Sequence, residues 1–157
     1  VAGSDSGLEL EAACRSARVQ CGGDGPACED QLRALGFPLR HYPQSFEFST
    51  LCGGIATRSG CHSATNQTHI DDMVESVRMV TPSGLWESRR LPGSVAGPSP
   101  DRIAIGSEGI LGIIPEAWMR SQARPVSRAS AGWTLATFAA GAEAARRLVQ
   151  TQLWPAN

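Results

Sequence analysis

Acidic and imidazole side chains that could do chemistry gather in one short stretch of the sequence. His69, Asp71 and Asp72 lie together, and His62 precedes them. A His–Asp pair can transfer protons, and imidazole and carboxylate groups can ligate a metal. A structural role explains the aspartates as well, because Asp favours the start of a helix, here a short turn before Met73. Both alternatives stay open, so we assign no catalytic residue and predict no metal site.

Three equally spaced glycines form a second candidate. Gly106, Gly109 and Gly112 match neither the dinucleotide-binding pattern G-x-G-x-x-G nor a P-loop. They are typical of a tight turn within a hairpin, or of a backbone surface close to a flat or anionic cofactor. Arg89 and Arg90 could pair with phosphate or carboxylate, with a solvated strand end as the simpler interpretation.

The cysteines predict free thiols. There are five of them, an odd number, and none forms a C-x-x-C pair. This argues against a disulfide framework and against a zinc site, so we expect five free, mostly buried thiols. Because no signal-peptide pattern is visible, we expect a cytoplasmic protein. The glycosylation sequon at 66–68 is then expected to be a chance match.

Charge and composition exclude several function classes. The 157 residues carry a formal net charge of −1. All basic residues are Arg, which excludes a Schiff-base lysine and a P-loop lysine. Without a basic excess we expect no nucleic-acid partner, and without an apolar run of about 20 residues we expect no membrane span. The length suggests one domain, or a domain with a fragment attached, and the start at Val1 suggests a piece of a longer protein.

Alternation and turn residues predict the elements of the first part. Segments 9–11 and 17–20 alternate as two strands of a hairpin, with a short amphipathic helix as the alternative. Pro26 is typical of the first turn of a helix, and Gly36 of a helix end. We expect a short strand over 39–42.

A long segment rich in small and polar residues, 43–68, follows. Long ordered loops are more often functional than plain connectors, and short side chains let backbone amides approach a ligand. We expect strands over 74–81 and 85–90, joined by a turn at 82–84, and another strand over 111–119.

The sequence pattern changes near residue 124. A loop over 92–100 precedes the last strand of the first part. Beyond 124 we expect a strand over 131–135 and an amphipathic helix over 138–153, with Thr137 as its N-cap. We therefore predict a domain boundary near 124.

Five segments match one family pattern, in chain order and over nearly the whole sequence. They are Pro43–Leu51, Ile55–Gly60, Ile70–Asp72, Ala96–Asp101 and Gly106–Ile114. Together they resemble the FAD-linked oxidases of the vanillyl-alcohol oxidase (PCMH) type. Within that family the sequence is most similar to the branch of alkyldihydroxyacetonephosphate synthase (alkylglycerone-phosphate synthase) and its bacterial FAD-binding relatives.

The resemblance implies an α+β fold. Residues 1–124 would form the second part of a PCMH-type FAD-binding domain, a mainly antiparallel sheet with flanking helices. Residues 125–157 would be the first strand and helix of a truncated substrate (cap) domain. The loop that binds the FAD diphosphate and most of the cap would lie outside this sequence. The implied partners of the full-length protein are FAD, a small-molecule or lipid-like substrate, and a second copy in a homodimer.

The resemblance also implies which residues line the flavin. They would form the wall of the site, with backbone amides and hydroxyls at the polar edge of the flavin and apolar side chains along its faces. These residues are Gln44, Ser45, Phe46, Glu47, Phe48, Ser49, Thr50, Thr57, Arg58, Ser59, Gly60, Glu108, Gly109, Ile110, Leu111, Gly112, Ile113 and Ile114.

Four positions depart from the family pattern. Cys52 and Cys61 stand where the family has Gly, Gly54 where it has Trp, and Pro115 where it has Thr. The implied function is part of a FAD-dependent oxidoreductase or alkylglycerone-phosphate-synthase-like enzyme, with this segment alone inactive. The departures motivate an alternative, a non-catalytic remnant or a nucleotide-binding scaffold with a degraded flavin site. A small interaction domain unrelated to flavins is a third hypothesis.

Overall fold

The first two strands form a hairpin. The computed structural model describes residues 7–61, 69–91 and 96–153. β1 (Leu8–Glu11) runs antiparallel to β2 (Ser16–Gln20). The hairpin interpretation is therefore confirmed and the helical alternative is wrong. The alternation along β2 places Ala17 and Val19 in the core, which is what selects a strand over a helix here.

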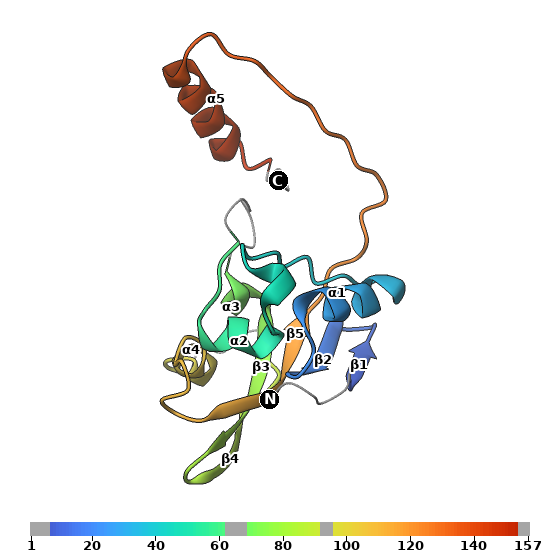
Figure 1. The fold of residues 1–157 in the computed structure, drawn as a ribbon, viewed down its shortest axis with the longest axis vertical. Coiled ribbons are helices and arrows are strands. Elements are labelled where there is room, and N and C mark those ends of the chain that lie inside the picture. The colour runs from blue at the N-terminus through green and yellow to red at the C-terminus, as the bar shows by residue number, and fades with distance from the viewer. Residues whose placement is uncertain (1–6, 62–68, 92–95, 154–157) are drawn as a thin grey trace.

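A five-stranded sheet forms the centre of the fold, in the order β1-β2-β5-β3-β4 (Figure 1). β3 (Val74–Thr81) and β4 (Gly84–Glu87) form the second predicted hairpin. β5 (Ile113–Arg120) lies between β2 and β3, and each neighbouring pair of strands is antiparallel. The mainly antiparallel sheet of the expected α+β fold is thus confirmed.

Helices connect the strands in the described part of the chain, and one more, α5, follows the sheet and lies apart from it (Figure 1). They are α1 (Gly25–Ala34), the 3-10 turn η1 (Phe46–Phe48), α2 (Leu51–Ala56), α3 (Ile70–Met73), α4 (Pro100–Ala104) and α5 (Phe138–Gln150). α1 begins and ends where the sequence predicts: Asp24 accepts a hydrogen bond from Ala27 N–H at 2.8 Å, Pro26 lies in the first turn, and Gly36 follows the end with a φ of 86°.

The expected strand over 39–42 is wrong. The N–H groups of Leu39 and Arg40 donate to one carboxylate oxygen of Glu29, at 2.9 and 3.0 Å. The buried Glu29 side chain therefore satisfies the backbone donors that a neighbouring strand would otherwise accept from. Arg40 also has a φ of 61°, which a regular strand does not allow.

The segment after residue 43 holds more regular structure than its composition predicts. Thr50 caps α2, because its hydroxyl oxygen accepts a hydrogen bond from Gly53 N–H at 3.1 Å. Gly53 and Gly54 lower the helix propensity of these residues, which hides α2 in the sequence. A Cβ at Gly54 would lie 2.9 Å from Ser59 Oγ, so α2 packs closely where the family has Trp.

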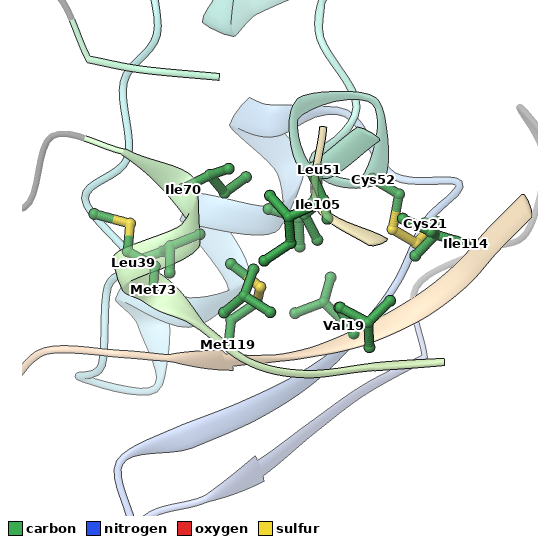
Figure 2. Close-up of a cluster of buried hydrophobic side chains, with 14 of the residues drawn as sticks. Val19, Cys21, Leu39, Leu51, Cys52, Ile70, Met73, Ile105, Ile114 and Met119 are labelled. Carbon is green, nitrogen blue, oxygen red and sulfur yellow. A yellow bond between two sulfur atoms is a disulfide. The ribbon is translucent and has the colours of Figure 1, made fainter. Parts of the chain in front are cut away.

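The hydrophobic core lies between the sheet and helices α1 to α3 (Figure 2). Val77 and Met119 of the sheet, and Leu32, Ile55 and Ile70 of the helices, each have 0% exposed surface. Full burial of one such side chain contributes about 1.5–3 kcal/mol to folding. The core therefore fixes α2 and α3 against the sheet, and with them the loops at their ends.

A disulfide joins Cys21, directly after β2, to Cys52 in α2, at the edge of this core (Figure 2). The expectation of five free thiols is thus wrong at these two positions. Cys28 is a buried free thiol, Cys61 a half-buried one and Cys14 an exposed one. The bridged Cα atoms are 5.1 Å apart, within the range that a disulfide spans.

A β-bulge accommodates Pro115 in the central strand. Between the pairs Arg78–Glu116 and Val80–Ile113, β5 contains one residue more than β3, and Pro115 lies in this stretch. A bulge interrupts the ladder, so the missing N–H of proline costs no paired hydrogen bond there. The departure from the family pattern at this position therefore leaves the strand intact.

The face of the sheet opposite the core carries a row of alternating charges. Glu9, Arg18, Glu116, Arg78 and Glu87 come one from each strand, in the order of the strands across the sheet. Arg18 lies 2.8 Å from Glu9 and 3.8 Å from Glu116, and Arg78 lies 2.8 Å from Glu116 and 2.9 Å from Glu87. Glu116 is the only one of the three carboxylates in this row that pairs with two guanidinium groups.

Replacing Glu116 with Gln is expected to lower the free energy of unfolding by about 1 kcal/mol. The Glu116 side chain is only 14% exposed, whereas that of Glu87, at the end of the row, is 47% exposed. Exposed ion pairs contribute little, so Glu87→Gln is expected to cost measurably less. Urea unfolding of both variants measures the difference, and equal losses would show that Glu116 is not central to the row.

Beyond residue 124 the chain leaves the sheet (Figure 1). Residues 125–137 form neither helix nor strand, so the expected strand over 131–135 is wrong, because it has no partner strand in the described residues. The helix expected next is confirmed as α5, and the hydroxyl oxygen of its N-cap Thr137 accepts from Ala140 N–H at 3.2 Å. The domain boundary near 124 stays a prediction. No helix in the described ranges is both long and apolar enough to cross a membrane.

Candidate functional site

The predicted wall of the site is assembled around α2. Residues 44–50 lead into its first turn, and residues 57–60 follow its last turn. The turn that contains Gly106 and Glu108 docks on that second end, because their N–H groups donate to α2 carbonyl oxygens at 3.0 and 2.9 Å. The structure thus brings the second and third predicted segments together, with the first segment at the opposite end of the helix.

The first segment is tied to the start of α1. The carbonyl oxygen of Ser49 accepts the N–H of the first α1 residue at 2.8 Å, and Thr50 forms an isolated β-bridge with the residue before α1. The Phe46 ring packs edge-on against Tyr42, with 5.0 Å between centroids, whereas Phe48 is 91% exposed. The other predicted members of this segment are exposed: Gln44, Ser45 and Glu47.

The third segment divides between surface and core. Ile110 and Ile113 are exposed, and so is Leu111 to a lesser degree, whereas Ile114 is buried in the core. The Ile114 side chain therefore packs inside the protein, and only its backbone is left to line a ligand. A Cβ at Gly112 would lie 2.3 Å from the carbonyl oxygen of Val80, so this segment runs directly against β3.

The three glycines are explained by backbone geometry. Gly106 and Gly109 have φ values of 81° and 86°, which favour glycine, and Gly112 allows the close approach to β3. Their turn connects α4 to β5 rather than two strands of one hairpin, so the hairpin interpretation is wrong. Glu108 has a φ of 50°, an uncommon conformation for a non-glycine residue.

A small cavity of about 30 Å³ lies between α1, the segment 39–46 and α2. Its lining includes four of the predicted wall residues, Phe46, Ser49, Thr50 and Ser59. A space of this size holds on the order of one or two water molecules. A flavin does not fit inside it, so a flavin would have to lie on the outer side of these segments.

His41 borders this cavity and was not a candidate in the sequence. It is 5% exposed, its Nε2 shares a hydrogen bond with Ser59 Oγ at 2.9 Å, and its Nδ1 has no partner among the described residues. Burial, with a smaller contribution from the charge of His69, lowers the pKa of His41. The one sequence signal was its place two residues before the matched segment 43–51.

Lowering the pH below about 6.5, the pKa of histidine in an unfolded chain, is expected to destabilise the protein. The unfolded chain then takes up a proton that buried His41 resists, so the free energy of unfolding falls as the pH falls. Thermal unfolding between pH 5 and 8 measures this trend, and His41→Gln is expected to flatten it. An unchanged slope in that variant would assign the trend to other groups.

The acidic stretch forms the start of a short helix. Asp71 and Asp72 lie in the first turn of α3, which begins after His69. No group of three or more His, Cys, Asp and Glu side chains in the described part of the chain could hold a metal ion. His62 and the sequon at 66–68 lie outside the described residues.

Arg90 binds carboxylates. It lies 2.7 Å from Glu11 and 3.1 Å from Glu75, and its guanidinium stacks on Trp118 at 3.6 Å from the ring centroid. The carboxylate interpretation is therefore confirmed for this arginine, and the simpler interpretation, a solvated strand end, is wrong at Arg90.

The predicted wall exposes the groups that a flavin requires. Phe48, Ile110 and Ile113 present uncovered apolar surface, which suits the faces of flat rings. Arg58, another residue of the predicted wall, has a side chain that is 57% exposed. A guanidinium group suits an anionic group such as a phosphate. These side chains fit FAD in chemical type.

Comparisons with known proteins agree on one family. The family model described as FAD binding domain matches residues 5–88. Alkyldihydroxyacetonephosphate synthase of Dictyostelium discoideum is 41% identical over 140 residues, which cover 89% of this chain and 23% of that protein. The Caenorhabditis elegans protein of the same name is 30% identical over 141 residues, covering 89% and 24%. An uncharacterised FAD-linked oxidoreductase of Escherichia coli is 34% identical over 105 residues.

Solved structures agree with the sequence matches. Two structures of alkyldihydroxyacetonephosphate synthase superpose with TM-scores of 0.70 and 0.69, each with 43% sequence identity over 76% of this chain. The chain spans 21% and 22% of those two chains, so it corresponds to less than a quarter of each. The resemblance in fold is confirmed over the part that superposes.

Proposed function

This chain belongs to the FAD binding domain family, with FAD as its cofactor, and we propose that it forms the wall of the flavin site in an enzyme of the alkylglycerone-phosphate synthase type. The observation that carries the proposal is the docking of the 106–109 turn on the end of α2. It joins segments 57–60 and 108–114, which are far apart in sequence, into one surface. Segment 44–50 extends that surface along α2.

Each part of the wall has a chemical role in this proposal. Bound FAD supplies electron-pair transfer at its ring system. The exposed side chains of Phe48, Ile110 and Ile113 cover apolar faces of the cofactor and exclude water from them. Polar groups of the 44–50 and 57–60 segments bond to its polar edges. These are mainly carbonyl oxygens, because the N–H groups at 46, 48, 49 and 57–59 already donate within the protein. We also propose a lipid-like substrate, a homodimer and a cytoplasmic location for the full-length protein.

The departures from the family pattern do not favour the alternative of a degraded site. Cys52 is in a disulfide, Gly54 allows close packing of α2, and Pro115 lies in a bulge. Cys52 and Cys61 are absent from the non-glycine residues with positive φ in the described chain, so neither replacement of Gly by Cys strains the backbone. All four positions therefore fit a sound scaffold.

Replacing Ile110 with Asp is expected to weaken FAD binding at least about tenfold, since covering one large apolar side chain contributes about 1.5–3 kcal/mol. Ile110 is 85% exposed, so the change should leave folding intact. Leu85→Asp is the matched control, because Leu85 is 63% exposed on β4, outside the predicted wall.

Titration of FAD into the full-length protein, followed by its visible spectrum, tests both the proposed function and the role of Ile110. The wild-type protein and the Leu85 variant are expected to take up FAD with a shifted spectrum, and the Ile110 variant only weakly. Failure of the wild-type protein to bind FAD would remove the proposed function, and equal affinities of the two variants would remove Ile110 from the wall.

A further inference from the structure

One buried carboxylate joins three elements next to the predicted wall. Asp71 of α3 is 5% exposed, and its Oδ2 accepts hydrogen bonds from Arg58 Nη2 at 3.0 Å and from Arg102 Nη1. Arg58 follows α2 and Arg102 lies in α4. The other oxygen of Asp71, Oδ1, has no hydrogen-bond partner among the described residues.

Arg58 is held in an unfavourable backbone conformation at this point. Its φ is 54°, uncommon for a residue with a side chain. A Cβ at Gly106 would lie 3.1 Å from Arg58 Cβ, so the backbone of the 106–109 turn lies directly against it. Strained residues persist only where the surroundings determine them, and they are concentrated at functional sites. The Arg58 position is therefore fixed by both its backbone and Asp71.

Asp71 is shared unequally between two positive charges. Arg58 and Arg102 both pair with the buried Asp71 carboxylate, and Arg102 also lies 4.0 Å from Asp72, whereas Asp71 is the one acidic partner of Arg58 among the described ion pairs. The side chains of Arg58 and Arg102 remain 57% and 50% exposed. Because Arg102 takes part of the negative charge of Asp71, Arg58 keeps positive charge and free N–H donors for a ligand.

We propose that Asp71 and Arg102 are positioning residues that hold the Arg58 guanidinium ready to bind an anionic group of FAD. This inference rests on the proposed function, which supplies the cofactor. Asp71 fixes the direction of the guanidinium, and Arg102 prevents Asp71 from neutralising it completely. Neither Asp71 nor Arg102 is among the residues that the family resemblance assigns to the cofactor.

Two explanations of Asp71 predict opposite results. If Asp71 acted only through its negative charge, Asp71→Asn would leave more positive charge and tighten the binding of anionic FAD. Positioning predicts the reverse: loss of an oriented charge-assisted hydrogen bond should weaken FAD binding on the order of tenfold. Arg102→Gln should weaken it severalfold, and Asp71→Glu should restore part of the affinity lost in Asp71→Asn.

The test measures FAD affinity of the full-length protein at several salt concentrations. The expected result is weaker binding by Asp71→Asn and Arg102→Gln, with a smaller dependence on salt than in the wild-type protein. In an Arg58→Gln background, Asp71→Asn should have no further effect, because its role acts through Arg58. Asp30→Asn, which removes an exposed carboxylate paired with Arg33 on α1, is the matched control and should behave as wild type.

Several outcomes would overturn the proposal. Tighter FAD binding by Asp71→Asn, wild-type affinity in Arg102→Gln, or an unchanged salt dependence in both variants would each contradict positioning. Thermal unfolding without FAD would show whether Asp71→Asn folds. If it does not, the FAD affinity of Arg102→Gln, which changes a half-exposed side chain, tests the proposal instead. If the wild-type protein takes up no FAD, the proposed function itself fails and this inference fails with it.

Discussion

Replacing Cys52 with Ala is expected to lower the free energy of unfolding by about 3–4 kcal/mol. The disulfide to Cys21 closes a loop with a sequence separation of 31 residues, and without it the unfolded chain gains the corresponding freedom. The bridge also ties the end of β2 to α2, directly after Ser49 and Thr50 of the predicted wall. FAD affinity is therefore expected to fall together with stability.

Chemical denaturation with and without a dithiol reductant measures this effect. The wild-type protein should lose stability on reduction, whereas the Cys52→Ala variant should show no further change. Cys28→Ala is the control for loss of a buried thiol, because Cys28 is unbridged and burial raises its pKa to about 12. If the reductant leaves the stability of the wild-type protein unchanged, the disulfide does not contribute to it.

Replacing Gly112 with Ala is expected to be the most damaging small substitution at the predicted wall. The added Cβ would lie 2.3 Å from the carbonyl oxygen of Val80 and 3.0 Å from Met79 Cγ. The first neighbour is backbone in a paired strand and cannot rotate away, so β5 has to shift. We expect a loss of at least about 2 kcal/mol of folding free energy, with weaker FAD binding because segment 108–114 moves.

Gly23→Ala is the matched control for this prediction. A Cβ at Gly23 has nothing within 4 Å, and the residue is not among those with positive φ. Its stability should change by less than about 0.5 kcal/mol. Urea unfolding of both variants measures the contrast, and similar stabilities would mean that β5 tolerates a side chain at 112.

Local patterns predicted the elements whose stability depends on local sequence. The alternation in 17–20 and 74–81 identified β2 and β3, since each strand buries one face. Pro26 and Gly36 marked the ends of α1 because each imposes a backbone conformation that suits one helix end. The α+β class and FAD came from the resemblance over several segments, and the family match confirms both.

What the sequence did not predict depends on contacts between distant residues. The strand expected over 39–42 is replaced by bonds to Glu29, which no pattern within that segment could reveal. The Cys21–Cys52 bridge needs the fold that brings its partners together. His41 escaped notice because its burial is a tertiary property. The residues of the flavin wall remain a prediction, although the structure explains how they assemble around α2.

FAD is expected to cover the surface formed around α2. Hydrogen exchange of the full-length protein, with and without FAD, tests it most directly, because bound ligand protects the amides that it covers. We expect new protection in residues 44–50, 57–60 and 106–114, and no change in β4. Protection confined to other segments, or none at these three in a protein that retains FAD, would contradict it.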